Sequence, residues 1–127
     1  MLVFCFLVIY IFFILCNTLF FRSPFDGEHL RLKLFWSYKV IGKQFSQMLG
    51  NVLLFVPFGT LMSILDRHFW RVFFIGLIFS CSIELVQFLL KIGLCELDDV
   101  FHNTLGTLIG LYFGKKVTEK RKKEQDK

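Results

Sequence analysis

The chain has 127 residues, of which 55% are hydrophobic and 18 are phenylalanine, and its formal net charge is +5. This composition and the positive mean hydropathy exclude a soluble globular protein, and the length allows one domain. The sequence therefore predicts an all-α, polytopic membrane protein, a bundle of about four transmembrane helices.

The first predicted span, Leu2–Phe21, contains no charged residue, and about 20 apolar residues suffice to cross a membrane as a helix. It has neither a basic start nor a small-residue cleavage site, so we interpret it as a retained helix and not as a secretory signal. The next segment, Arg22–Ser46, carries five basic residues. Its stretch from Leu30 to Met48 mixes basic, aromatic and aliphatic residues, which predicts a loop along the membrane surface.

The second predicted span, Gln47–Leu65, has a polar amide, Asn51, near its start. Pro57 removes one backbone donor and crowds the carbonyl of Leu53, so we expect a kink here, with Gly59 close by. Such a kink would open space beside Asn51. The alternative for this amide, and for the two amides that follow on later spans, is an interhelical hydrogen bond worth about 0.6 kcal/mol.

The third predicted span, Trp70–Leu90, carries one polar stripe at steps of three and four residues. Glu84 lies about two turns inside the end of this span, where a carboxylate must be neutralised, paired or hydrated. It could exchange a proton, or it could share a divalent cation with an aspartate of the next span. It could also pair with Arg22 or Arg31 of the first loop. The stripe comprises Gly76, Ser80, Glu84, Gln87 and Lys91.

The fourth predicted span, Val100–Gly114, is short, and it would cross a membrane only with an aspartate before it and the snorkelling Lys115 and Lys116 after it. Two overlapping GxxxG steps favour the close approach of another helix. These glycines share a face with Asp99 and Asn103, so both polar side chains should point into the bundle. That face comprises Asp99, Asn103, Gly106, Gly110 and Gly114.

The polar residues that flank the apolar runs should meet at one face of the membrane, because successive spans reverse direction. Ionisable and amide side chains at membrane depth are costly and usually face a protein interior or an aqueous cavity, so this convergence predicts a site. His102, one turn from Asp98, either joins the site or lies at the headgroup level. No catalytic template such as HExxH or a P-loop is indicated, and a metal or another cofactor stays open. The candidate residues are Asn51, Glu84, Gln87, Asp98, Asp99, His102 and Asn103.

The charges of two loops and of the tail predict that both termini are cytoplasmic, and the loop Arg22–Ser46, with five basic residues, is the exception because this topology places it outside. The loop Asp66–Arg71 and the tail, residues 115–127, are basic, whereas the loop Lys91–Asp99 has one lysine and three acids and should lie outside. We interpret the tail as a segment that meets anionic headgroups and not as a nucleic-acid site. The four cysteines show no paired spacing, so neither a disulfide framework nor a zinc site is expected.

Three ordered stretches carry a family pattern: NVLLFVPFGTL at Asn51–Leu61, SIELVQFLL at Ser82–Leu90 and GLCELDDVFHNTLGTLIG at Gly93–Gly110. Together they resemble the VanZ-like family of bacterial membrane proteins, with motifs over residues 51–114 of a domain at 1–114. By position, the pattern matches Asn51, Pro57, Gly59, Glu84, Gln87, Asp99, Asn103 and Gly106. Many members also carry an arginine several residues before the paired acids, where this chain has Lys91-Ile92-Gly93-Leu94.

The resemblance implies a small multi-span bundle in the bacterial cytoplasmic membrane. The member that gives the family its name is associated with resistance to teicoplanin, a lipoglycopeptide antibiotic. The leading expectation is thus an envelope protein whose outer-leaflet polar site engages membrane lipids or a lipid-linked cell-wall component.

Two other functions stay open. In an enzyme acting on lipid headgroups, Glu84 and Asp99 would be acid and base or metal ligands, with Asn51 and Asn103 as orienting donors. In a structural or oligomerisation module, the glycine ridge formed by Gly106, Gly110 and Gly114 would pack against another helix, and the oligomeric state is open.

Overall fold

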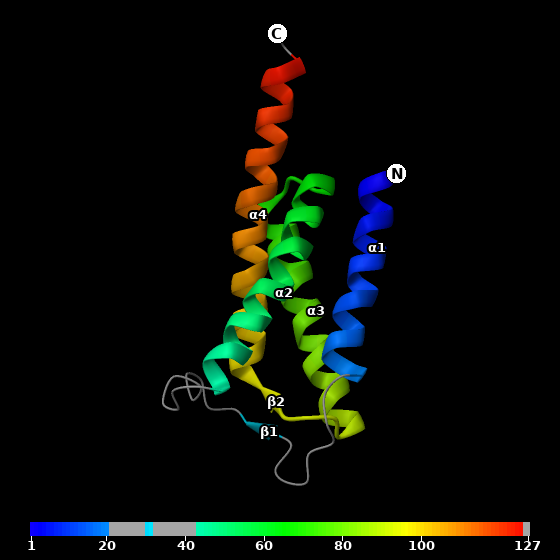
Figure 1. The fold of residues 1–127 in the computed structure, drawn as a ribbon, viewed down its shortest axis with the longest axis vertical. Coiled ribbons are helices and arrows are strands. Elements are labelled where there is room, and N and C mark those ends of the chain that lie inside the picture. Colours follow the sequence, from blue (N-terminus) through cyan, green and yellow to red (C-terminus); the bar gives the residue numbers. More distant parts are fainter. Residues whose placement is uncertain (21–29, 32–42, 126–127) are drawn as a thin grey trace.

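A computed structural model describes residues 1–20, 30–31 and 43–125 and forms a bundle of helices (Figure 1). The described helices are α1 (Leu2–Leu15), α2 (Lys43–Leu65), α3 (Phe69–Leu90) and α4 (Leu97–Gln125), and α1 continues into a π-helical turn, η1 (Cys16–Phe20). Two short strands, β1 (Leu30–Arg31) and β2 (Cys95–Glu96), pair in parallel. The predicted all-α bundle is confirmed.

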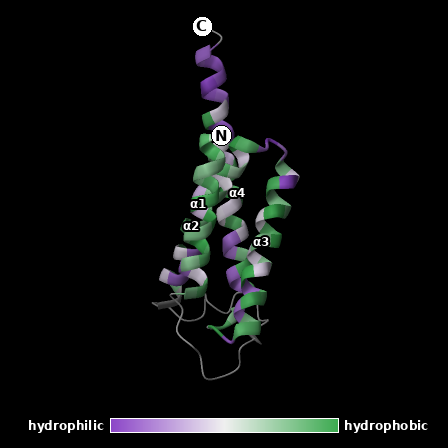
Figure 2. Cartoon of the chain, turned by 90° about the vertical axis from the view of Figure 1, so that its right-hand side faces the viewer, coloured by the Kyte–Doolittle hydropathy of each residue, from purple (hydrophilic) through white to green (hydrophobic). Residues whose placement is uncertain are grey.

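Three of the described helices are long and apolar enough to cross a membrane: Leu2–Phe20, Phe45–Leu65 and Phe69–Leu90. Their bounds lie within a few residues of the predicted spans. The predicted fourth span belongs to α4, which is the longest described helix, with 29 residues, but is less apolar than the other three. Helix α4 continues without a break through residue 114 into the basic tail (Figure 2). The predicted surface loop lies mostly outside the described residues.

Helix α4 packs along α2, and the glycine ridge of α4 forms this contact. A Cβ atom added to Gly110 would lie 2.7 Å from the backbone nitrogen of Thr60, and one added to Gly106 would lie 2.9 Å from Cβ of Phe55. The Thr60 hydroxyl also donates a hydrogen bond to the Gly110 carbonyl, at 3.1 Å. Backbones can approach this closely only where side chains are missing. The ridge, which could have served a second copy of the chain, is therefore covered by α2.

Thr107 of α4 fills the junction of three helices. A Cβ atom added to Gly59 of α2 would lie 2.9 Å from Cα of Thr107, and one added to Gly76 of α3 would lie 2.6 Å from its Cγ2. Thr107 is fully buried, and its hydroxyl donates to the carbonyl of Asn103 at 3.0 Å. The two small residues thus let a hydroxyl-bearing side chain fit between α2 and α3.

Helix α2 is helical from Lys43 to Leu65 with Pro57 inside it, so the proline does not end the helix. It leaves the carbonyl of Leu53 without its usual helical donor. The next carbonyl, that of Leu54, accepts a hydrogen bond of 2.9 Å from the hydroxyl of Tyr10 on α1. Apolar packing holds α1, α2 and α3 together around a buried cluster of Leu7, Ile14, Phe55, Phe58 and Ile83.

Candidate functional site

The polar residues singled out above lie toward one end of the bundle. Helices α2 and α4 begin at this end, and η1 and α3 finish there, while both chain termini lie at the opposite end (Figure 1). The hydropathy colours show the same division, with hydrophilic residues along the early part of α4 and again in its last turns (Figure 2). The alternating helix directions produce this clustering, and burial then decides which side chains face inward.

On α3 the predicted stripe is buried as far as Gln87. Ser80, Glu84 and Gln87 are all less than 5% exposed. Lys91, the last stripe residue, is exposed and has a φ of 54°, which is the left-handed conformation that ends α3. The stripe therefore faces the inside of the bundle for about three turns, and its last residue is the exposed end of the helix.

Two of the candidate amides connect helices. The Asn103 side chain donates from Nδ2 to the hydroxyl of Ser80, at 2.9 Å, and this bond joins α4 to α3. The Gln87 side chain donates from Nε2 to the backbone carbonyl of Thr18, also at 2.9 Å, and joins α3 to η1. Both amides thus make the kind of interhelical hydrogen bond that the alternative interpretation describes.

Glu84 is tied to the loop that leads into α4. Its Oε2 accepts a hydrogen bond of 3.0 Å from the backbone N–H of Glu96 in β2. Glu96 pairs in register with Arg31 of β1, so the first loop reaches the same end of the bundle. Arg22, the other predicted partner, lies outside the described residues.

Two buried carboxylates open α4. Asp98 and Asp99 are in its first turn and are 2% and 4% exposed. Negative charge is favourable at this position because the first N–H groups of a helix are unbonded and its dipole is positive there. His102 is buried on the following turn. Within the described ranges, no three or more His, Cys, Asp or Glu side chains converge as metal ligands.

Two buried amide atoms have no hydrogen-bond partner among the described residues: Nδ2 of Asn51, a donor, and Oδ1 of Asn103, an acceptor. Buried polar atoms are rarely left unbonded, and each costs about 1–3 kcal/mol. The α2–α4 register brings the two residues to a similar level. Gly106, one turn after Asn103, faces the carbonyl of Val52, which is the neighbour of Asn51.

Sequence reasoning did not assign site roles to several polar partners. The predicted stripe includes Ser80 but does not identify it as the hydrogen-bond partner of Asn103. Thr107 lies four residues after Asn103, so the helical spacing that groups the other candidates would also have placed it on the buried face. Thr18 and Glu96 contribute backbone groups, for which the sequence carries no signal.

The comparison with a family model covers most of the chain. The family model of VanZ/LLP1 matches residues 2–117, so the first helix is included. Protein VanZ of Enterococcus faecium is 36% identical over 69 residues, which cover 53% of this chain and 43% of that protein. The chain therefore matches less than half the length of this relative. No solved structure matches. Because the family model matches well over half of the chain, the chain belongs to the VanZ/LLP1 family.

Proposed function

We propose that the chain is a multi-pass protein of the bacterial cytoplasmic membrane whose polar site engages a lipid headgroup or a lipid-linked cell-wall component at the outer leaflet. Through this contact it contributes to resistance to teicoplanin. The observation that carries the proposal is the pair of buried amide atoms, Nδ2 of Asn51 and Oδ1 of Asn103, without partners among the described residues. A donor and an acceptor held at one level of a helix pair can bind a polar headgroup.

Charge supports the proposed orientation. The end that carries the termini has Arg67 in the loop after α2, Arg71 in the first turn of α3 and the basic last turns of α4. At the opposite end the loop Lys91–Asp99 has one lysine against three acids, whereas the first loop, Arg22–Ser46, carries five basic residues and departs from this pattern. Since basic segments stay on the cytoplasmic side, the polar site faces outward.

An apolar groove beside the site supports a lipid as the partner. It has a volume of about 410 Å³ and lies between α3 and α4. It includes Leu97 and Phe101, which flank Asp98 and Asp99 in the first turns of α4. A headgroup at the polar residues could therefore extend an acyl or polyprenyl chain into the groove. Its lining residues are Phe73, Leu77, Leu97, Val100, Phe101, Thr104, Leu105 and Leu108.

Teicoplanin susceptibility in a susceptible Gram-positive host tests the proposal. The wild-type chain should reduce susceptibility, and Asn51→Leu should abolish the effect. Replacing an unbonded buried donor by an apolar side chain is neutral or stabilising, so Asn51→Leu should be expressed normally. Gly50→Ala is the matched control, because a Cβ atom there has nothing within 4 Å. A wild-type chain without effect would refute the resistance role, and Asn51→Leu with full effect would refute the part assigned to the polar site.

A second candidate function is catalysis on a lipid headgroup. It is favoured by the burial of Glu84, Asp99 and His102 to less than 5% exposure at one end of the bundle. Buried carboxylates and imidazoles are suited to proton transfer. Lipid profiles of cells expressing Glu84→Gln should then show an accumulated substrate, whereas profiles identical to wild type at equal expression would exclude Glu84 as a catalytic group.

A further inference from the structure

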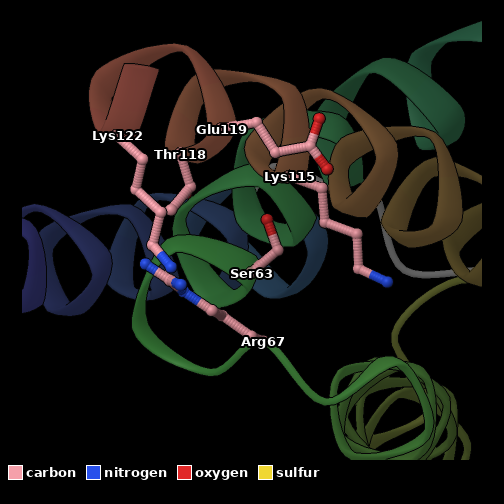
Figure 3. A pocket seen from close by; sticks show the side chains of 6 residues that line it. All are labelled: Ser63, Arg67, Lys115, Thr118, Glu119 and Lys122. Atoms are coloured by element: carbon pink, nitrogen blue, oxygen red, sulfur yellow. The ribbon is translucent and has the colours of Figure 1, made fainter. Parts of the chain in front are cut away.

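A second polar feature lies at the opposite end of the bundle. There, the end of α2, the loop after it and the last turns of α4 enclose a pocket of about 340 Å³ (Figure 3). Three of its side chains are positively charged and one is a carboxylate. Its lining residues are Ser63, Arg67, Lys115, Thr118, Glu119 and Lys122.

The three positive charges of this pocket outnumber its one carboxylate, that of Glu119, and two of the cations form no ion pair with a described residue. Among the described residues, the ion pairs at this end join Asp66 to His68 and Arg71, at 2.9 and 3.2 Å. Arg67 and Lys122 have no described carboxylate oxygen within 4.0 Å. Their charged ends point toward one another in Figure 3. Two cations that face each other repel, and an anion between them would remove this repulsion.

The side-chain donors of the pocket match a negatively charged ligand that is rich in hydrogen-bond acceptors. The hydroxyls of Ser63 and Thr118 already donate to carbonyls of their own helices, at 3.0 and 2.9 Å. The remaining side-chain donors are the guanidinium of Arg67 and the two ammonium groups. The charged oxygens of a phosphate group are strong acceptors, and the guanidinium fork binds two of them in a bidentate manner.

Aromatic residues place the pocket at the level of lipid headgroups. Trp70 and Tyr112, which respectively follow Arg67 and precede Lys115 by three positions, are well exposed, and Nζ of Lys116 lies 4.7 Å from the ring centre of Tyr112. Nζ of Lys115, which lines the pocket, lies 5.5 Å from the ring centre of Phe69. Tryptophan, tyrosine and snorkelling lysine characterise the boundary between the apolar core and the headgroups.

We propose that this pocket binds a phosphate group, and that Arg67 and Lys122 are its main ligands. An anionic lipid headgroup and inorganic phosphate both carry this group. The site is separate from the polar site of α2, α3 and α4, and it uses none of the same residues.

Binding to the full chain, purified in a neutral detergent, tests the proposal. Native mass spectrometry and the shift of the unfolding midpoint are measured with short-chain phosphatidic acid, short-chain phosphatidylcholine and inorganic phosphate. Binding of phosphatidic acid alone identifies a lipid headgroup, and binding of inorganic phosphate as well identifies a site for the free anion. Binding of neither phosphatidic acid nor inorganic phosphate, or equal binding of phosphatidylcholine and phosphatidic acid, overturns the proposal.

Two double variants separate the pocket from general attraction to basic residues. Each basic residue near an anionic headgroup contributes about 1 kcal/mol, so Arg67→Gln with Lys122→Gln should weaken binding by roughly tenfold or more. Lys120→Gln with Lys123→Gln removes the same charge outside the pocket and should change binding by less than about threefold. Equal weakening by the two double variants would show that the pocket is not the site.

Discussion

The variant Gly110→Ala probes the contact between α2 and α4 on which the polar site depends. A Cβ atom there would meet the carbonyl of Val56 and lie 2.7 Å from the nitrogen of Thr60, and both are backbone atoms that cannot rotate away. Overpacking of this kind costs about 1–3 kcal/mol. Separating the helices would also remove the hydrogen bond from Thr60 to the Gly110 carbonyl, worth about 0.6 kcal/mol. The alanine regains up to about 1 kcal/mol of helix propensity. The net expectation is a loss of roughly 2 kcal/mol.

Unfolding in mixed micelles with increasing sodium dodecyl sulfate measures this loss as a change in free energy. Gly50→Ala provides the control, because it replaces a glycine in α2 whose added Cβ has nothing within 4 Å. Its expected change is a small stabilisation, at most about 1 kcal/mol, from helix propensity alone. The reasoning is refuted if the two variants change stability by the same amount and sign.

Three further predictions concern one hydrogen bond, one carboxyl group and the orientation of the chain. A double-mutant cycle of Asn103→Leu and Ser80→Ala should give a coupling of about 0.6 kcal/mol in micelles, and zero coupling would contradict their hydrogen bond. Hydrogen bonds from the backbone N–H and the ring of His68 lower the pKa of Asp66 from 3.8 to about 2. The ionised Asp66 therefore stabilises the folded state fully at pH values above 3.8, its pKa in the unfolded chain, and this stabilisation is lost as the pH falls toward 2. The unfolding midpoints of wild type and Asp66→Asn should thus converge at low pH. Midpoints that differ by the same amount at every pH would contradict this. In intact cells, a membrane-impermeant maleimide should label Cys95 at the outward end, with Cys95→Ser as control, and labelling only after lysis would reverse the proposed orientation.

Much of the bundle could be predicted because apolar length and helical spacing act locally. The uncharged run from Leu2 and the stripe of Ser80, Glu84 and Gln87 required only the membrane thickness and the helical repeat. The grouping of polar residues at one end followed from alternating helix directions. These features do not depend on which helix packs against which.

The remaining features depend on pairings between distant parts of the chain. The glycine ridge indicated a close helix contact but not that α2 would supply it, and nothing local places Thr107 between Gly59 and Gly76. The hydrogen bond from Glu96 to Glu84 uses a backbone N–H, which has no sequence signature. The basic pocket needs the loop after α2 to meet α4 about 50 positions later, so the tail charges alone predicted only general attraction to headgroups.

The most direct test of the outer-leaflet site is photocrosslinking in cells. A benzoylphenylalanine replaces Phe101, which lines the apolar groove beside the polar site, and the captured lipids are identified by mass spectrometry. The same probe at Phe113, further along α4, reports the bulk membrane. The account predicts that one lipid or lipid-linked wall component is enriched at position 101 relative to 113, that Asn51→Leu abolishes the enrichment and that Gly50→Ala preserves it. Identical lipid profiles at the two positions, or enrichment that persists in Asn51→Leu, would contradict it.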